Sequence, residues 1–171
     1  MRDKINNNLS IVIPTYNRAD FLDYSLEIHI PLAKKYNIPI YVVDNASTDN
    51  TGEIVNKWMC EYVFLFYSRN KKNLGPDLNF EIALNKPSTD YVWLLGDTSK
   101  IKKEVFRSVV KQSEKVFDLI LLNSEKRVFD IESQFVSDKN LLLSTLGWHM
   151  THMSTLIYNK NIIENANFFR F

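Results

Sequence analysis

Four short polar segments could do chemistry together, because each follows an apolar, β-branched run of the chain. They are residues 14–18, 44–49, 70–75 and 96–99. The apolar runs predict buried strands, and in open α/β sheets ligands bind beyond the carboxyl ends of the strands. We therefore expect the four segments to meet at one edge of a sheet. Their carboxylates, amides, arginine and tyrosine suit the recognition of a base, a ribose and a diphosphate.

The aspartates of the second segment differ in how well local structure explains them. Asp49 and Thr51 are explained by capping the helix that is expected to follow. Asp44 is not, because a charged residue there directly ends an apolar strand, and we assign it a functional role. For Tyr16 and Arg18 the alternatives to ligand binding are a surface aromatic ring and a solvated charge.

Glycine is scarce, which argues against the best-known phosphate-binding loops. The chain has 4 glycines and no glycine-rich loop of the Rossmann or P-loop type. Gly75 precedes Pro76, so a turn into a helix explains it as well as a ligand contact does. Dinucleotide-binding and P-loop functions are therefore disfavoured. A nucleotidyltransferase, which needs a glycine- and lysine-bearing loop after its first strand, ranks third among the functions considered.

Composition excludes several other classes of protein. The 171 residues are 45% hydrophobic and 24% charged, as in a globular chain that can bury a core. The net charge of +1 argues against nucleic acid as a partner, since such proteins usually carry a clear basic excess. Cys60 is the only cysteine, which excludes an internal disulfide and suits a reducing cytoplasm. We expect neither a signal peptide nor a transmembrane helix, because no apolar run approaches about 20 residues.

The elements that would position the polar segments alternate between strand and helix. Strands are predicted at about 9–15, 40–43, 62–67, 91–95, 119–122 and, more weakly, 154–158. Helices are predicted from about residues 20, 51, 76, 102 and 138. Pro31 should end or kink the first of them. This pattern indicates an α/β fold with a mostly parallel central sheet and helices on both faces, formed by one domain over residues 1–171.

The polar segments also resemble those of family 2 glycosyltransferases, which have the GT-A fold. The family's paired opening signature is similar to SIVIPTYNR at residues 10–18 and VVDNASTDNT at 42–51. Its continuation resembles NLGP at 73–76 and then DYVWLLGD at 90–97, at the right interval. The Leu-Gly-Asp ending is most similar to the branch that includes abequosyltransferase-like enzymes. The resemblance covers residues 8–125 well, and four motifs in this order are specific.

The resemblance implies a nucleotide-sugar site at the expected edge of the sheet. The nucleoside would be held by residues 14–16 and by Asp44, whose carboxylate would accept an N–H of the base. Asp97 would be the first aspartate of the family's acidic motif, which touches the ribose and a divalent cation. The full set of candidates for nucleotide-sugar binding is Pro14, Thr15, Tyr16, Arg18, Asp44, Asn45, Asn73, Gly75, Asn79 and Asp97.

The acidic motif departs from the family pattern. The family expects one or two further aspartates where this chain has Thr98 and Ser99. A hard cation bridging a diphosphate prefers carboxylate oxygens, so one carboxylate and a hydroxyl form a weaker site. We therefore expect Mg²⁺ or Mn²⁺ to bind weakly and only together with a nucleotide. Asp97 is the first candidate ligand. The second is His152, or else His149, by resemblance to family members that use a late histidine.

The C-terminal part of the chain is a second departure. Family members are usually longer, and their later segment supplies the acceptor wall and a general-base carboxylate, so we expect this chain to lack that segment. Carboxylates available by residue type alone are Glu125, Asp130, Glu132 and Asp138, and surface charge explains each of them better. The tail carries Phe168, Phe169 and Phe171. Such a tail suits truncation, a partner, or a second copy of the chain in a homo-oligomer that covers it.

Together these patterns predict a glycosyltransferase that uses a nucleoside diphosphate sugar. Transfer would invert the anomeric centre and go to a saccharide or lipid-linked acceptor during surface polysaccharide synthesis. The expected location is cytoplasmic, including a peripheral position at the inner face of the membrane. The main alternative is a truncated or degenerate transferase that binds a nucleotide or a partner without turnover.

Overall fold

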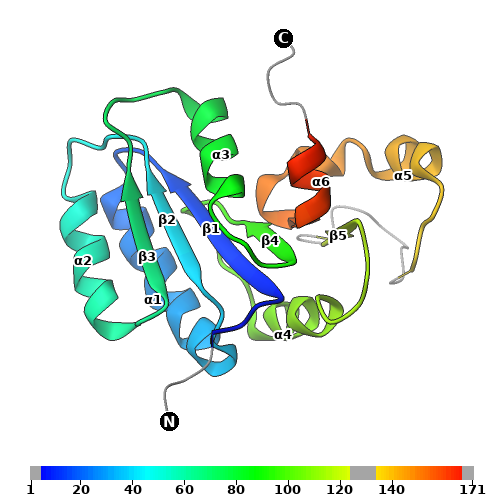
Figure 1. Cartoon of the computed structure of the whole chain (residues 1–171), viewed down its shortest axis with the longest axis horizontal. Coiled ribbons are helices and arrows are strands. Elements are labelled where there is room, and N and C mark those ends of the chain that lie inside the picture. The colour runs from blue at the N-terminus through cyan, green and yellow to red at the C-terminus, as the bar shows by residue number, and fades with distance from the viewer. Residues whose placement is uncertain (1–4, 124–133, 167–171) are drawn as a thin grey trace.

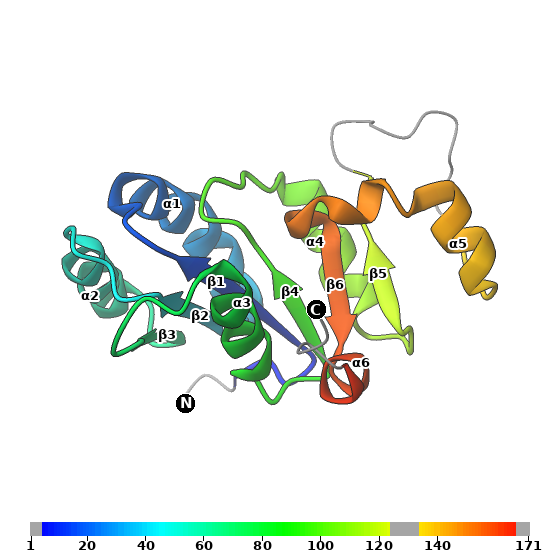
Figure 2. The ribbon, with the colours of Figure 1, turned by 90° about the horizontal axis from the view of Figure 1, so that it is seen from above.

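The computed structural model of the chain describes residues 5–123 and 134–166. At its centre is a six-stranded sheet in the order β3-β2-β1-β4-β6-β5 (Figures 1 and 2). The parallel part consists of β1 (Leu9–Thr15), β2 (Ile40–Asp44), β3 (Leu65–Arg69) and β4 (Tyr91–Leu94). The antiparallel part is formed by β6 (Leu156–Asn159), which pairs with β4 on one side and with β5 (Leu119–Leu121) on the other.

Helices cover both faces of the sheet, as the sequence predicts. They are α1 (Ala19–Tyr36), α2 (Thr51–Glu61), α3 (Pro76–Asn85), α4 (Lys103–Gln112) and α6 (Lys160–Asn165), whereas α5 (Lys139–Leu146) lies to one side of the sheet and buries no residue. Figure 1 shows α3 and α6 on the near face and α1, α2 and α4 behind the sheet. Two short 3₁₀ turns, η2 (His149–Thr151) and η3 (Met153–Thr155), lead into β6. In the described part of the chain, no helix is both long enough and apolar enough to span a bilayer.

The core lies in two layers because alternate side chains of each strand point to opposite faces. Ile11 and Ile13 of β1 pack with α1 and α4 on the far face, where the apolar stripe of α1 and Phe106 of α4 are fully buried. Val12, between them, packs on the near face with Ala83 of α3 and Ile163 of α6. This two-sided burial fixes the strands so that the loops at their ends have a rigid base.

Several boundaries differ from the sequence expectation. Helix α1 continues through Pro31 and ends in a left-handed residue, Asn37, with φ 54°. A proline removes a single helical hydrogen bond, whereas burial of Leu22, Leu26 and Ile30 stabilises the helix on both sides of it. Strand β3 begins at Leu65, later than predicted, because the segment before it forms a turn in which the Leu65 N–H donates to the Tyr62 carbonyl.

Candidate functional site

The carboxyl ends of the four parallel strands lie along one edge of the sheet, from which loops lead to α1, α2, α3 and α4 (Figure 1). The polar segments predicted to converge occupy these loops. Backbone hydrogen bonds join neighbouring loops, since Asn45 N–H donates to the Thr15 carbonyl (2.9 Å) and Asn70 N–H to the Asp44 carbonyl (2.9 Å). These bonds extend the hydrogen-bond ladder of the parallel strands by one residue beyond their carboxyl ends, which holds the loops in register.

Asp97 contacts Thr15, the last residue of β1, and Arg18, in the loop that follows the strand. Its Oδ2 accepts a hydrogen bond from the Thr15 hydroxyl (3.1 Å), and its Oδ1 is 3.6 Å from Nε of Arg18. The residue is only 7% exposed. Burial raises the pKa of the Asp97 carboxyl, and the positive charge of Arg18 and the Thr15 hydrogen bond partly oppose that rise. A buried carboxyl with a perturbed pKa at a strand edge is the kind of group found in functional sites.

Asp44 is fully buried and has partners on both oxygens. Its Oδ1 accepts from the Ser47 N–H (2.8 Å) and from the Ser47 hydroxyl (2.5 Å). Its Oδ2 accepts from the Tyr67 hydroxyl (2.7 Å) and lies 3.6 Å from Nε of Arg69. Arg69 also donates to the Ser47 carbonyl. Asp44 thus joins the loop after β2 to the end of β3, a structural role that its position in the sequence did not reveal.

A network of asparagine side chains joins the loops after β2 and β3 to α3. Asn45 donates to Asn73 Oδ1 (2.8 Å) and to the Gly75 carbonyl (3.1 Å). Asn70 donates to Asn45 Oδ1 (3.0 Å) and to Asn79 Oδ1 (2.9 Å). Asn79 in turn donates to the Val43 carbonyl. These bonds between side-chain amides join the loops to one another and stiffen the wall of the site.

Gly75 adopts a conformation that favours glycine. Its φ is +83°, in the region that side chains of L-residues rarely adopt, and it directly precedes Pro76 at the start of α3. Its N–H donates to Asn73 Oδ1 (2.8 Å). Gly75 therefore forms the turn into α3, which was one of the two explanations of this glycine that the sequence left open.

The segment between β1 and α1 forms a shallow hollow of about 220 Å³. It is lined by Asn17, Arg18, Ala19, Asp20, Phe21, Asp49 and Asn50. Asp49 accepts from the Thr51 hydroxyl (2.6 Å) and from the N–H groups of Ala19 (3.0 Å) and Thr51 (3.1 Å), and these bonds hold the pKa of its carboxyl low although burial acts the other way. Asp49 thus binds N–H groups at the start of both α1 and α2, although the N-cap residue of α2 is Asn50 and Thr51 is already helical. Pro14 is buried in β1, and Tyr16, the first residue after β1, is 40% exposed.

The two residues in place of further aspartates have different surroundings. Thr98 is exposed. Ser99 is half-buried, and its hydroxyl is hydrogen-bonded to that of Ser154, in η3. Ser154 also accepts from the N–H of Gly96 (3.0 Å). Ser154 had no signal in the sequence, because its partners are distant along the chain.

The two candidate histidines differ in their surroundings. His152 is exposed, whereas His149 is buried and its Nε2 lies 2.7 Å from the Leu122 carbonyl. Among residues 5–123 and 134–166, no group of three or more His, Cys, Asp or Glu side chains could hold a metal ion.

Of the four carboxylates considered as a general base, the structure describes Asp138. Asp138 caps α5 by accepting from the N–H groups of Asn140 (2.8 Å) and Leu141 (3.3 Å). Glu125, Asp130 and Glu132 lie outside the described residues, as do Phe168, Phe169 and Phe171.

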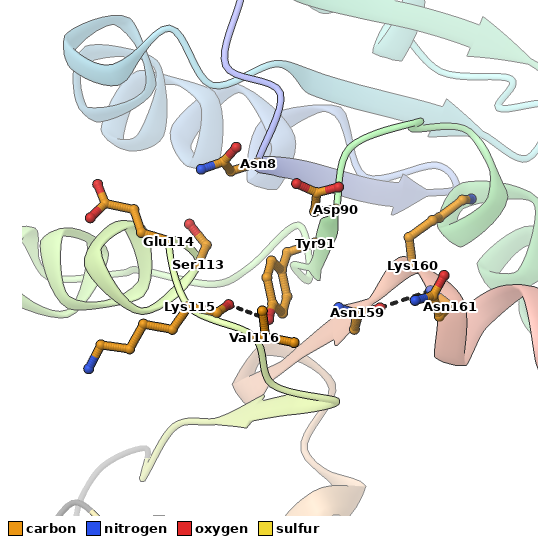
Figure 3. A pocket seen from close by; sticks show the side chains of 10 residues that line it. All are labelled: Asn8, Asp90, Tyr91, Ser113, Glu114, Lys115, Val116, Asn159, Lys160 and Asn161. Carbon is orange, nitrogen blue, oxygen red and sulfur yellow. Dashed lines mark hydrogen bonds between the residues drawn. The ribbon is translucent and has the colours of Figure 1, made fainter.

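A second hollow, of about 450 Å³, lies at the opposite edge of the sheet (Figure 3). The hydroxyl of Tyr91 donates to the Lys115 carbonyl there (2.7 Å), and the side chains of Lys115 and Lys160 extend to opposite sides of the Tyr91 ring. Asn159 accepts from the Asn161 N–H (3.0 Å) and so caps α6. These polar contacts are structural. Asp97 lines neither hollow, but Arg18, whose guanidinium contacts Asp97, lines the smaller one, which is therefore the better candidate for chemistry.

A family model and several known proteins are similar to this chain over most of its length. The model of the family described as "Glycosyl transferase family 2" matches residues 10–158. Abequosyltransferase RfbV of Salmonella typhimurium is 32% identical over 157 residues, which are 90% of this chain and 45% of that protein. TarS of S. aureus, solved in complex with UDP-GlcNAc, has a TM-score of 0.64 at 23% identity, covering 92% of this chain and 46% of that one.

A third similar protein was crystallised with both a nucleotide sugar and a metal ion. It is the mannosyltransferase PcManGT from Pyrobaculum calidifontis in complex with GDP-Man and Mn²⁺, with a TM-score of 0.65 at 16% identity. The match covers 92% of this chain and 46% of that one. The chain thus spans less than half the length of each of these three proteins.

Proposed function

Because the chain belongs to glycosyl transferase family 2, we propose that its carboxyl edge binds the nucleoside diphosphate of a sugar donor. The observation that carries the proposal is the group of Asp97, Thr15 and Arg18, which joins a buried carboxylate, a hydroxyl and a guanidinium from two different loops. The similarity to abequosyltransferase-like proteins and the GT-A fold, both expected from the sequence, are confirmed by the matches above. The names of two neighbours include UDP-GlcNAc and GDP-Man, which supports a nucleotide sugar as the class of ligand.

The roles within the site follow from exposure and charge. Arg18, whose side chain is 47% exposed, supplies positive charge that can face a diphosphate while it still contacts Asp97. Tyr16 offers an exposed ring against which a base can stack. Asp44 holds the loop after β2 and the side chain of Arg69 in place, and its fully buried carboxylate must become accessible before it can accept a base N–H directly.

A divalent cation does not fit the described residues on their own. Asp97 already contacts Thr15 and Arg18, and a guanidinium next to the carboxylate repels a cation. Exposed Thr98 adds only a hydroxyl. Any Mg²⁺ or Mn²⁺ must therefore take most of its ligands from the diphosphate and from water. For this reason, we assign no step of the reaction to a metal ion.

The reaction we propose is transfer of the sugar with inversion. The hydroxyl of an acceptor attacks the anomeric carbon, a new C–O bond forms, and the bond to the diphosphate oxygen breaks to release the nucleoside diphosphate. A general base takes the proton of the acceptor hydroxyl. The acceptor is a saccharide or a lipid-linked saccharide in surface polysaccharide synthesis, at the cytoplasmic side of the membrane. The similarity to an abequosyltransferase supports this setting.

A second candidate function is nucleotide binding without turnover, by a chain that forms one GT-A domain. It is favoured by the single carboxylate of the acidic motif and by the capping role of Asp138. The two functions share the donor site and differ in the presence of an acceptor site and a base.

Isothermal calorimetry with the diphosphates of uridine, guanosine, cytidine and thymidine tests the donor site. We expect at least one to bind, and Asp97→Asn to weaken its binding by about tenfold or more, since a hydrogen bond to a charged group contributes roughly 1.5–3 kcal/mol. The matched control is Asp90→Asn, at the opposite end of the same strand and exposed. Equal affinity of the Asp97 and Asp90 variants, or no binding of any diphosphate, would refute the proposed site. Release of diphosphate from a matching sugar donor then separates transfer from mere binding.

A further inference from the structure

The loop that carries Asp97 begins with a tight turn. The N–H of Ser99 donates to the carbonyl of Gly96 (3.0 Å), so Asp97 and Thr98 occupy the two corner positions of a four-residue turn. The backbone before the turn is held by the sheet, because Leu95 N–H donates to the Val12 carbonyl (2.9 Å). The direction in which Asp97 points is therefore set by how firmly this turn is closed.

A single hydroxyl from elsewhere in the chain binds both ends of the turn. Ser154 Oγ accepts from the Gly96 N–H (3.0 Å) at the first position and is hydrogen-bonded to Ser99 Oγ at the last. Ser154 is 8% exposed, so these bonds form away from water. In such surroundings an unmade hydrogen bond is costly, and the turn has little freedom to open.

Ser154 is itself fixed by the sheet. Its carbonyl accepts from the indole N–H of Trp93 in β4 (3.0 Å), and two residues further on the chain enters β6, which pairs with β4. The approach is close, since a Cβ added to Gly96 would lie 3.3 Å from Ser154 Oγ and 3.4 Å from Met153 Cε. Glycine at position 96 lets η3 come near enough for the serine to reach the turn.

We propose that Ser154 is a positioning residue for the donor site, because its hydroxyl closes the turn over residues 96–99 and so directs Asp97 toward Thr15 and Arg18. The proposal rests on the function proposed for Asp97. It assigns to the segment before β6 a role in donor binding, although that segment is distant in sequence from the other loops of the site. Ser99 then stabilises the turn instead of acting as a ligand.

The test compares Ser154→Ala with Ser10→Ala in the full chain. Ser10 is a matched control, because it is also a buried serine of this sheet and its hydroxyl accepts from Thr89 (2.7 Å) away from the site. The probe is the best-binding diphosphate of the four above. We expect Ser154→Ala to weaken its binding about three- to tenfold, the effect of one or two hydrogen bonds, and Ser10→Ala to leave it unchanged. Ser99→Ala, which keeps the bond from Gly96, should lie between them.

A second readout separates positioning from general loss of stability. Carbon-13 NMR of the Asp97 carboxyl follows its titration. Opening of the turn should hydrate the group and so lower its raised pKa, because burial is the largest cause of that rise and outweighs the opposite effects of Arg18 and Thr15. This change is expected in Ser154→Ala and not in Ser10→Ala. If the two variants bind the diphosphate and titrate alike, Ser154 has no positioning role.

The outcome for Asp97→Asn distinguishes two kinds of failure. If that variant weakens binding and Ser154→Ala does not, the donor site stands and the positioning role is wrong. If neither variant affects binding, or if no diphosphate binds, the proposed function itself fails and the positioning role fails with it. Thermal unfolding of each variant shows whether a change in binding accompanies partial unfolding, and the titration of Asp97 in the folded state then decides.

Discussion

Protonation of His29 should destabilise the protein in mildly acidic solution. His29 lies on α1 and is fully buried. Its Nδ1–H donates to the Ser25 carbonyl (2.7 Å), and its Nε2 accepts from the N–H of Ile101 (3.2 Å), at the far end of the loop that carries Asp97. A proton on Nε2 would replace that acceptor with a second donor. Burial accordingly lowers the pKa of His29 from 6.5 to about 4, although the Ser25 hydrogen bond acts in the opposite direction.

The size of the effect follows from the difference in pKa between the two states. Because the folded-state pKa is depressed, the unfolded chain binds the proton more readily, and stability falls as the pH drops from about 6.5 toward about 4. One pKa unit corresponds to about 1.4 kcal/mol, so the full loss is roughly 3 kcal/mol, of which about 2 kcal/mol is reached by pH 5. Above about pH 6.5 the contribution is fully present.

Urea unfolding of the native chain and of His29→Gln between pH 4.5 and 7.5 measures this loss. The glutamine amide can replace both hydrogen bonds of the imidazole but cannot titrate. The other titratable groups are the same in the two proteins, so their effects cancel in the difference between the two curves. We expect the native chain to lose about 2 kcal/mol more than the variant between pH 7 and 5. Parallel curves would show that His29 is not a buried neutral histidine held between Ser25 and Ile101.

Three further predictions concern the donor site. Asp44→Ala should lower the free energy of unfolding by about 2–4 kcal/mol and also weaken diphosphate binding, since the substitution leaves Arg69 and Tyr67 without their buried partner. An unchanged urea unfolding curve would contradict the expected loss of stability. Thr98→Asp should strengthen Mn²⁺ binding to the diphosphate complex about three- to tenfold, as measured by water-proton relaxation. Ser99→Asp should not strengthen it, because the side chain at position 99 faces Ser154. Equal gains in the two variants would show that both positions face the ligand. The 171-residue chain alone should release diphosphate from sugar donors very slowly in a coupled assay, and rapid release with a defined acceptor would show that a base is present.

The sequence predicted the architecture because burial leaves a periodic trace. Continuous apolar runs marked the parallel strands, and helical spacing marked the helices between them. Once the strands are parallel, their carboxyl ends must share an edge, so convergence of the four polar segments followed without any knowledge of contacts. Strand direction for β6 could not be predicted in this way, since an apolar run of four or five residues reads the same in either direction.

Individual contacts were beyond the sequence for a different physical reason. Asp97 meets Thr15, and Ser99 meets Ser154, across long stretches of chain, and such pairs leave no local pattern. Pro31 does not end α1, because local propensity at the proline competes with burial of a whole helix face, and that burial stabilises the helix by more than the proline destabilises it. Whether Asp44 binds a ligand or supports the loops could be judged only once its hydrogen-bond partners were known.

The order of strands in the sheet also bears on how the protein is made. β6 lies between β4 and β5, although β5 comes first along the chain. While the chain is being synthesised, the outer edge of β4 therefore stays unpaired until Leu156–Asn159 has emerged, and among the described strands β5 has no partner until then. Because Ser154 closely precedes β6, arrival of that strand pairs the β4 edge and closes the Asp97 turn in the same event. A nascent chain stopped before this point would carry four parallel strands and an unfinished donor site.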